Sequence, residues 1–287
     1  MVHASTLPAA VEDPGATAPR TTPTIARSCK VSLIIPTRNE SDSVPLLFEK
    51  LNEVLAATSH EVILVDDSDD DTPEVADRVA AELGLNASVI HRDGEDRRGG
   101  LSSAVLVGVA AACGEYVCVM DADLQHPPEL IALMIATATE KEADIVVASR
   151  YVEGGTDAGL SGRARKMISL TSRGLTRTLF RGRLQTIRDP LSGFFLARRS
   201  LVIGTALRPI GFKILLDILV RSEWQIAEEV PLRFERRAVG SSKATLRQGR
   251  DFLAHVARLF WERRTGGIKH VEAVPRAGEV RAAQTRS

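Results

Sequence analysis

Two aspartates separated by one residue, Asp121 and Asp123, stand where the apolar run "YVCVM" (116–120) ends. If the strand continues through them, both carboxylates point to the same side and repel unless a cation lies between them. Carboxylate oxygens suit a hard divalent ion such as Mg²⁺ or Mn²⁺, and Gln125 offers a third oxygen. The alternative is a loop acid that caps the helix starting near Pro128, and the spacing alone leaves both open.

A second acidic segment, "DDSDDDT" (66–72), also follows an apolar run. It lacks the glycine that an EF-hand calcium loop has at its sixth position. The later acids and Thr72 can cap a helix that opens at Pro73. We expect Asp66 and Asp67, at the strand end, to accept hydrogen bonds from a base or a ribose.

The segment "RRGGLSSA" (97–104) places a glycine pair at the start of a helix. A glycine backbone lets a ligand approach closely, and a helix N-terminus favours anions. The segment is neither a Walker loop nor G-x-G-x-x-G, so dinucleotide binding has little support. A plain turn is the alternative.

Alternating strands and helices must position these groups. Apolar runs of strand length alternate with segments of helical period, which predicts a parallel sheet covered by helices on both faces. The expected strands are 30–37, 61–67, 87–92, 116–123 and 143–150, and the expected helices are 43–57, 73–83, 100–113 and 128–140. Such sheets bind ligands at the carboxyl ends of their strands. We therefore expect the following to converge on one edge: Glu40, Asp66, Asp67, Asp121, Asp123 and Arg150.

Composition bounds the class of protein. The chain has 287 residues and a formal net charge of zero, so nothing in it indicates a nucleic-acid partner. Three cysteines without a C-x-x-C pair predict buried or idle thiols in a reducing, cytoplasmic compartment. Residues 1–28 and 265–287 have the composition of disordered tails. The longest apolar run, 104–113, is about half of a membrane span, so we expect a soluble or peripheral protein.

Eight segments in a fixed order give a more specific signal. They are "IIPTRNE", "VDDSDDDT", "RRGGLSSA", "MDADLQHPPEL", "VASRYVEGG", "DPLSGFF", "GFKILLDIL" and "EVPLRFERRAVGSSK". Together they resemble family 2 glycosyltransferases of the GT-A fold, and within that family the dolichyl- or polyprenyl-phosphate mannose synthases. The resemblance implies an α/β catalytic domain over 29–245 with a mostly parallel, Rossmann-like sheet. A C-terminal amphipathic helix over 246–264 would follow it.

The resemblance also implies roles for individual residues. Asp121, Asp123 and Gln125 match the site for Mg²⁺ or Mn²⁺ and the donor diphosphate, and Asp123, Asp189 and Arg165 match residues at the reaction centre. The remaining matches to the nucleotide-sugar site are Pro36, Thr37, Asn39, Glu40, Asp67, Arg150, Ser192, Arg237 and Lys243. Departures from the family pattern at Arg38, Asp71 and Ala244 bear on the donor pocket and its closing segment.

The implied reaction is inverting transfer of a hexose, mannose from GDP-mannose, to a polyprenyl monophosphate at the cytoplasmic face of a membrane. Residues 158–188 hold eight Lys or Arg and no acid, which predicts a helix on an anionic membrane surface or a solvated basic face. A small membrane-anchoring partner for the C-terminal helix is also open. The alternatives are a UDP-sugar donor with the same lipid, an inactive nucleotide-binding module, and a soluble transferase with a small or protein acceptor.

Overall fold

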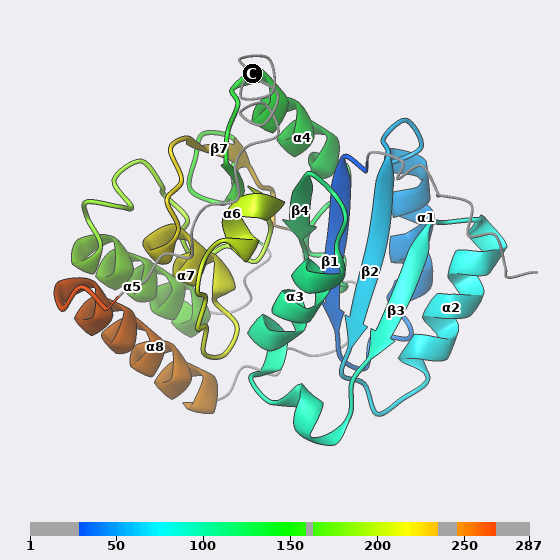
Figure 1. Ribbon diagram of the computed structural model, residues 1–287, viewed down its shortest axis with the longest axis horizontal. Helices are drawn as coiled ribbons and strands as arrows, with labels where there is room; N and C mark the ends of the chain where they lie inside the picture. The colour runs from blue at the N-terminus through cyan, green and yellow to red at the C-terminus, as the bar shows by residue number, and fades with distance from the viewer. Residues whose placement is uncertain (1–28, 159–162, 235–245, 268–287) are drawn as a thin grey trace, which may run out of the picture.

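The structure is a computed structural model that describes residues 29–158, 163–234 and 246–267 (Figure 1). The predicted N-terminal tail lies outside the described residues, as do Arg237, Lys243 and most of the predicted C-terminal tail. Arg165 is described only as part of a helix, without its side chain. Within the described residues, no helix combines the length and the apolarity that crossing a membrane requires.

One seven-stranded sheet, in the order β3-β2-β1-β4-β6-β5-β7, forms the centre of the molecule. Every strand pairs in parallel with its neighbours except β6, which is antiparallel to both β4 and β5. The strands are β1 (Val31–Thr37), β2 (His60–Asp66), β3 (Ala87–His91), β4 (Tyr116–Val119), β5 (Ile145–Ser149), β6 (Phe195–Arg198) and β7 (Ala227–Pro231). The mostly parallel sheet is therefore confirmed, and two strands, β6 and β7, come in addition to the five expected.

Helices follow most strands and begin or end at the residues that favour such boundaries. Pro45 lies in the first turn of α1, and Gly84 ends α2 in the left-handed conformation with φ 62°. The helices are α1 (Val44–Val54), α2 (Thr72–Leu83), α3 (Gly100–Ala111), α4 (Leu130–Glu140), α5 (Arg163–Leu179), α6 (Arg199–Ile203), α7 (Ile214–Arg221) and α8 (Leu246–Arg264), with a short 3₁₀ helix η1 (Gly94–Arg97).

The sheet separates two hydrophobic cores, as the alternation of side chains along β1 shows. Leu33 and Ile35 pack into the core shared with α1, α2 and α4, whereas Ile34 packs into the core shared with α3, α7 and α8. Helices thus cover both faces of the sheet, as predicted (Figure 1). Most strand residues that face these two cores are apolar and buried, so burial determines which way each strand faces.

One predicted strand is shorter than expected, and this changes the argument about the paired aspartates. The expected strand 116–123 ends at Val119, where its pairing with Ile34 of β1 and Phe195 of β6 also ends. Asp121 and Asp123 therefore lie in the loop after β4. Strand alternation does not orient them, because the strand ends before them, and Leu124 then turns the chain with a left-handed φ of 61°.

Candidate active site

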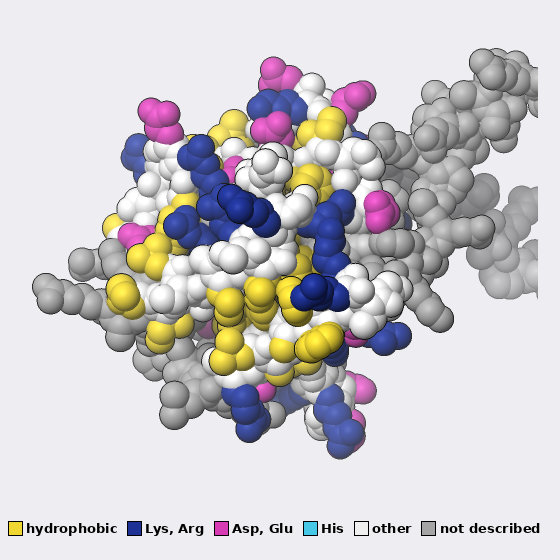
Figure 2. Space-filling model, turned by 90° about the vertical axis from the view of Figure 1, so that its left-hand side faces the viewer, with side chains coloured by type: hydrophobic (Ala, Val, Ile, Leu, Met, Phe, Trp, Pro, Cys, Tyr) yellow, Lys and Arg dark blue, Asp and Glu magenta, His cyan; other side chains and the backbone are white. Residues whose placement is uncertain are grey.

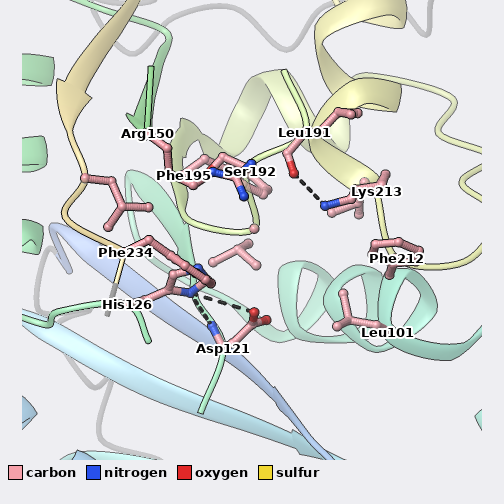
Figure 3. Close-up of a pocket in the computed structure, with 14 residues that line it drawn as sticks. Leu101, Asp121, His126, Arg150, Leu191, Ser192, Phe195, Phe212, Lys213 and Phe234 are labelled. Carbon is pink, nitrogen blue, oxygen red and sulfur yellow. Dashed lines mark hydrogen bonds and ion pairs between the residues drawn. The ribbon is translucent and has the colours of Figure 1, made fainter. Parts of the chain in front are cut away.

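A pocket opens at the edge of the sheet where β4 and β5 end and β6 begins (Figure 3). Its polar wall includes Asp121, His126, Arg150, Ser192 and Lys213, and its apolar wall is made by Leu101, Val119, Leu191, Phe195, Phe212, Ile214, Leu232 and Phe234. The prediction that Asp121 and Arg150 converge on one edge is met by this pocket. Figure 3 shows Asp121 and His126 on one side, with Arg150, Ser192 and Lys213 across the pocket from them.

Asp121 is held in the pocket wall by His126. The backbone N–H of Asp121 donates to Nδ1 of His126 at 3.0 Å, while the side chain of Asp121 remains 41% exposed. Burial lowers the pKa of His126, although Asp121 opposes this effect. The ring is therefore neutral, with Nδ1 as acceptor and the proton on Nε2. It packs between Phe194 and Phe234, at centroid distances of 5.1 Å and 5.8 Å, so it supports Asp121 from behind.

Asp123 occupies the turn that follows. It is 4% exposed, and its Oδ1 accepts a hydrogen bond from the backbone N–H of Gln125 at 3.0 Å. This bond closes the turn around Leu124. The three residues predicted as metal ligands therefore lie within one five-residue loop, with Asp121 in the pocket wall.

Arg150 and Asp189 form a buried ion pair on the side of the pocket opposite Asp121. Nε and Nη2 of Arg150 donate to the two carboxylate oxygens of Asp189 at 2.8 Å and 2.9 Å, and the Arg150 backbone N–H adds a third bond. Burial alone would lower the pKa of Arg150, but Asp189 outweighs it and the pKa is raised. Asp189 has no exposed surface, so it acts by orienting Arg150. Glu229 on β7 accepts the backbone N–H groups of Arg188 and Asp189, which fixes this loop.

Lys213, at the start of α7, is the second cation in the pocket. Its Nζ donates to the backbone carbonyl of Leu191 at 2.7 Å (Figure 3). Burial, reinforced by the charge of Arg150, lowers the pKa of Lys213 to about 8. An ammonium has three N–H donors, so Lys213 can donate to further acceptors besides the carbonyl of Leu191. An anion in this pocket would therefore be attracted by both Lys213 and Arg150.

Ser192 lines the pocket but is used for structure. Its hydroxyl donates to the carbonyl oxygen of Ala148 at 2.7 Å and lies 3.2 Å from the Phe194 backbone N. These bonds tie the loop before β6 to the end of β5.

The acidic segment after β2 is more buried than its composition predicts. Asp66 is fully buried and accepts hydrogen bonds from Thr37, Ser68 and the ring of His91. Asp67 pairs with Arg92 through two bonds of 2.8 Å and 2.7 Å. Both carboxylates are thus occupied by protein groups. A ribose or base contact by Asp67 stays a prediction.

The end of β1 is joined to the same segment. Asn39 has a left-handed φ of 55°, and its backbone N–H donates to Ser68 while its side chain accepts from the backbone of Asp69. Glu40 is held by a backbone bond to Thr72. Pro36 is buried at the end of β1. The residues predicted to contact the nucleotide therefore lie together, at the carboxyl ends of β1 and β2.

The glycine pair is also connected to this network. Arg97 contacts Asp69 and donates to the carbonyl oxygen of Ser68 at 2.6 Å. Gly99 has φ 90°, and a Cβ there would lie 2.9 Å from Cβ of Ser103. The tight turn into α3 therefore requires glycine for its backbone, so the plain-turn reading accounts for Gly99.

Comparisons with known proteins place this geometry. The profile of "Glycosyl transferase family 2" matches residues 32–204, which include β1 to β6 and the paired aspartates. The chain belongs to glycosyl transferase family 2. It is 41% identical over 235 residues to a protein of Pyrococcus furiosus named dolichol-phosphate mannosyltransferase, covering 81% of this chain and 64% of that relative's length. A protein of Saccharomyces cerevisiae with the same name is 32% identical, covering 81% of this chain and 88% of the relative.

Solved structures support the fold of this family 2 glycosyltransferase. Glucosyl-3-phosphoglycerate synthase from Mycobacterium tuberculosis, in complex with Mn²⁺, UDP-glucose and phosphoglyceric acid, matches with a TM-score of 0.60. The two are 18% identical, and the match covers 81% of this chain and 80% of that chain. At this identity the likeness concerns the fold, which is GT-A as predicted.

The donor set of the family 2 enzyme fits a hard divalent ion. Asp121 and Asp123 offer carboxylates and Gln125 an amide oxygen, whereas no third acid or histidine joins them in the described parts of the chain. Mg²⁺ and Mn²⁺ suit such a small set of oxygen ligands, because they take their other ligands from substrate phosphates and water. The predicted metal role of these three residues remains a proposal.

Two charged residues of the site were not assigned from the sequence. Arg92 stands directly after β3, in the same position relative to its strand as Arg150, and that placement was the available signal. Lys213 lies in "GFKILLDIL", one of the eight segments of the resemblance, but no residue of that segment was given a role. Neither signal predicts which carboxylate or which pocket the side chain reaches.

Proposed function

We propose that this enzyme transfers mannose from GDP-mannose to the phosphate of a polyprenyl monophosphate. The observation that carries the proposal is the pocket, in which Asp121 faces two partly buried cations, Arg150 and Lys213. Donor diphosphate and acceptor phosphate both need cationic partners. The relatives named dolichol-phosphate mannosyltransferase support the choice of sugar and lipid.

The acceptor phosphate needs placement more than a base. An oxygen of the phosphate, already anionic at neutral pH, forms a bond to the anomeric carbon, while the bond from that carbon to the donor diphosphate breaks. Arg150 is rigid because Asp189 accepts hydrogen bonds from Nε and Nη2 of its guanidinium, so it can orient a phosphate with little further loss of rotamer freedom. Lys213 offers compensating charge beside it. Attack from the face opposite the leaving group inverts the anomeric carbon.

The aspartate loop serves the leaving group. When bound by Asp121 and Asp123, Mg²⁺ or Mn²⁺ would supply positive charge that stabilises the departing diphosphate. His126 keeps Asp121 at the pocket wall, and the hydrogen bond from Gln125 keeps Asp123 in the turn.

A membrane-facing surface near α5 supports the lipid acceptor. Met167 and Ile168 on α5 are 61% and 64% exposed, and Trp261 on α8 is 65% exposed. Figure 2 shows apolar side chains gathered on the side of the molecule that carries α5 and α8, with Lys and Arg beside them. The guanidinium of Arg173 on α5 stacks on the ring of Tyr151, with its Cζ 3.9 Å from the ring centroid. Tyr151 is the residue that follows Arg150 of the pocket. The helix that would meet the lipid is thus joined to the pocket.

A donor panel tests the reaction. Purified protein with Mn²⁺ or Mg²⁺ and a short polyprenyl phosphate is given GDP-mannose, UDP-glucose and UDP-N-acetylhexosamine in separate reactions, and the lipid product is weighed by mass spectrometry. We expect a hexosyl-phosphate lipid from GDP-mannose. If only a UDP-sugar gives product, that UDP-sugar replaces GDP-mannose as the proposed donor. Donor binding by calorimetry without any product would support the inactive module.

The membrane face has a matched control. Met167→Glu with Ile168→Glu should lower binding to anionic liposomes roughly tenfold or more, because it places acids on the apolar and basic surface. Leu133→Glu on α4, where Leu133 is 46% exposed, adds an acid elsewhere and should leave binding unchanged. Equal binding by the parent and both variants would favour a soluble acceptor. A small membrane-anchoring partner and a cytoplasmic location stay predictions.

A further inference from the structure

A second cluster of chemically reactive side chains lies at the amino ends of the strands, opposite the pocket. Cys29 precedes β1, Glu61 is the second residue of β2, and Cys113 lies in the turn between α3 and β4. Their ligand atoms, two sulfurs and a carboxylate oxygen, all lie within 4.8 Å of one another. Among the described residues, this is the single group of three such side chains with metal-ligand spacing.

Backbone bonds hold the three side chains together. The backbone N–H of Cys113 donates to Oε1 of Glu61 at 2.7 Å, and the backbone N–H of Glu115 donates to the carbonyl oxygen of Cys29 at 3.0 Å. Gly114 lies so close to β1 that a Cβ there would come within 2.6 Å of the backbone nitrogen of Ser32. The turn is therefore pressed against β1 by a glycine contact, and the cluster is set by the fold.

The chemistry of the cluster matches one class of ion. Two thiolates with one carboxylate favour a borderline-soft divalent cation over Mg²⁺ or Ca²⁺. Tetrahedral Zn²⁺, with sulfur near 2.3 Å and oxygen near 2.0 Å, needs ligand atoms about 3.5–3.8 Å apart. The observed grouping, with all three atoms within 4.8 Å of one another, exceeds this spacing by about 1 Å at most. Cys113 is exposed, which leaves room for a water as the fourth ligand.

We propose that Cys29, Glu61 and Cys113 bind one Zn²⁺ ion, which links the starts of β1 and β2 to the turn before β4.

The electrostatics agree with the geometry. Although Cys113 is exposed as a residue, desolvation of its sulfur, followed by Glu61, raises the pKa of the thiol to about 12, and burial also raises the pKa of Cys29. Both thiols resist ionisation in part because Glu61 lies beside them. A divalent cation removes that repulsion and releases the thiol protons, so binding should strengthen as the pH rises.

The test uses the full chain without a polyhistidine tag, carrying Asp123→Ala to weaken metal binding by the aspartate loop. The protein is reduced with a phosphine, loaded with Zn²⁺, dialysed and analysed for metal. A second sample is titrated with Co²⁺, whose thiolate charge-transfer band reports sulfur ligation directly. We expect one zinc per chain, the cobalt band, and a rise in Tm of roughly 5 °C at about a hundredfold excess over Kd.

Variants assign the ligands. Cys29→Ser and Cys113→Ser should each abolish the cobalt band, and Glu61→Gln should weaken zinc binding roughly tenfold or more. Cys118→Ala removes the third cysteine, which is buried in β4, and should leave the band and the zinc content unchanged.

Three results would overturn the proposal. The parent with all its cysteines could show no thiolate band with Co²⁺. This measurement does not depend on the folding of any cysteine variant. The double variant Cys29→Ser/Cys113→Ser could retain the zinc. Intact mass of protein purified with Zn²⁺ but without any reductant could show a Cys29–Cys113 disulfide, which would make the pair a redox element. Sugar transfer is measured on separate samples with intact Asp123, so the outcome does not depend on the proposed reaction.

Discussion

The two ends of the parallel strands differ in how they handle charge. At the carboxyl ends, acids and arginines are paired inside the protein, as Arg150 with Asp189 and Arg92 with Asp67. At the amino ends, Cys29, Glu61 and Cys113 bring together groups that would all be anionic when ionised. The first arrangement fixes side chains for a ligand that comes and goes. The second arrangement would be stabilised most by a permanently bound cation, which removes the repulsion between the three groups. The two proposals thus place a hard, oxygen-based metal site and a soft, sulfur-based one at opposite ends of one sheet.

The sharpest way to break this comparison is Asp123→Ala. We expect transfer to fall roughly 10³-fold or more, because the loop that serves the diphosphate loses a carboxylate. Calorimetry should show that donor binding no longer depends on Mn²⁺. Cys29→Ser/Cys113→Ser at the other end should keep transfer within about twofold. Unchanged rates in Asp123→Ala would remove the metal assignment from this loop.

The paired charges should also differ in what they contribute to stability. Asp189→Ala leaves Arg150 buried without its partner, so the free energy of unfolding should fall by about 3–5 kcal/mol in urea titrations. Lys30→Ala breaks the half-exposed Lys30–Glu115 ion pair, 2.8 Å long, at the amino end, and should cost less than about 1 kcal/mol. Similar losses in both variants would contradict the view that the buried ion pair at the carboxyl end stabilises the fold more than the exposed pair at the amino end.

Lys213→Met tests the second cation of the pocket. The side chains are similar in length, and replacing a partly buried ammonium removes its desolvation cost, so the protein should stay folded. We expect kcat/KM for the lipid phosphate to fall roughly 10²-fold. Lys141→Met, at an exposed ion pair before β5, is the matched control and should be close to the parent. Parent-like kinetics in Lys213→Met would leave Arg150 as the cation that matters.

The pH dependence of stability should contain a smaller effect from a group that lies at neither end of the strands. Burial lowers the pKa of His255 on α8 to about 4, with Asp217 opposing and Arg258 and Arg221 adding to the shift. The unfolded chain takes up this proton near pH 6.5, so stability should fall by about 1–3 kcal/mol as the pH drops from about 6.5 towards 4, and level off below. His255→Phe should flatten this part of the urea-unfolding profile. An unchanged slope would assign the acid sensitivity elsewhere.

The sequence predicts the first half of the fold because its strands are continuous apolar runs ending in acids. Strands β1, β2, β3 and β5 begin and end within about two residues of the prediction, since burial on both faces leaves a clear pattern. Strand β6 has four residues between a turn and a helix, too few to show a period. The partners of Asp67 and Asp189 lie 25 and 39 positions away, so spacing could not reveal them.

The cysteines at the amino ends of the strands show the same limit of sequence-based prediction. Cys29 and Cys113 stand 84 positions apart and match no ligand spacing, which predicts idle thiols. They come together only because β1 and β4 are neighbours in a sheet whose order differs from the order along the chain. Pairing between strands, rather than local pattern, therefore decides where both sites lie.

The reversed direction of β6 has one more consequence. Its first residue, Phe195, pairs with Val119 at the end of β4 and with Val147 near the end of β5. The connection from β5 therefore leaves the catalytic rim and returns to it without crossing the sheet. Length changes in that excursion, which holds α5 and Asp189, could remodel what the enzyme accepts while the nucleotide half keeps its framework. Under the proposed function, acceptor choice and donor choice would therefore be carried by separable stretches of chain.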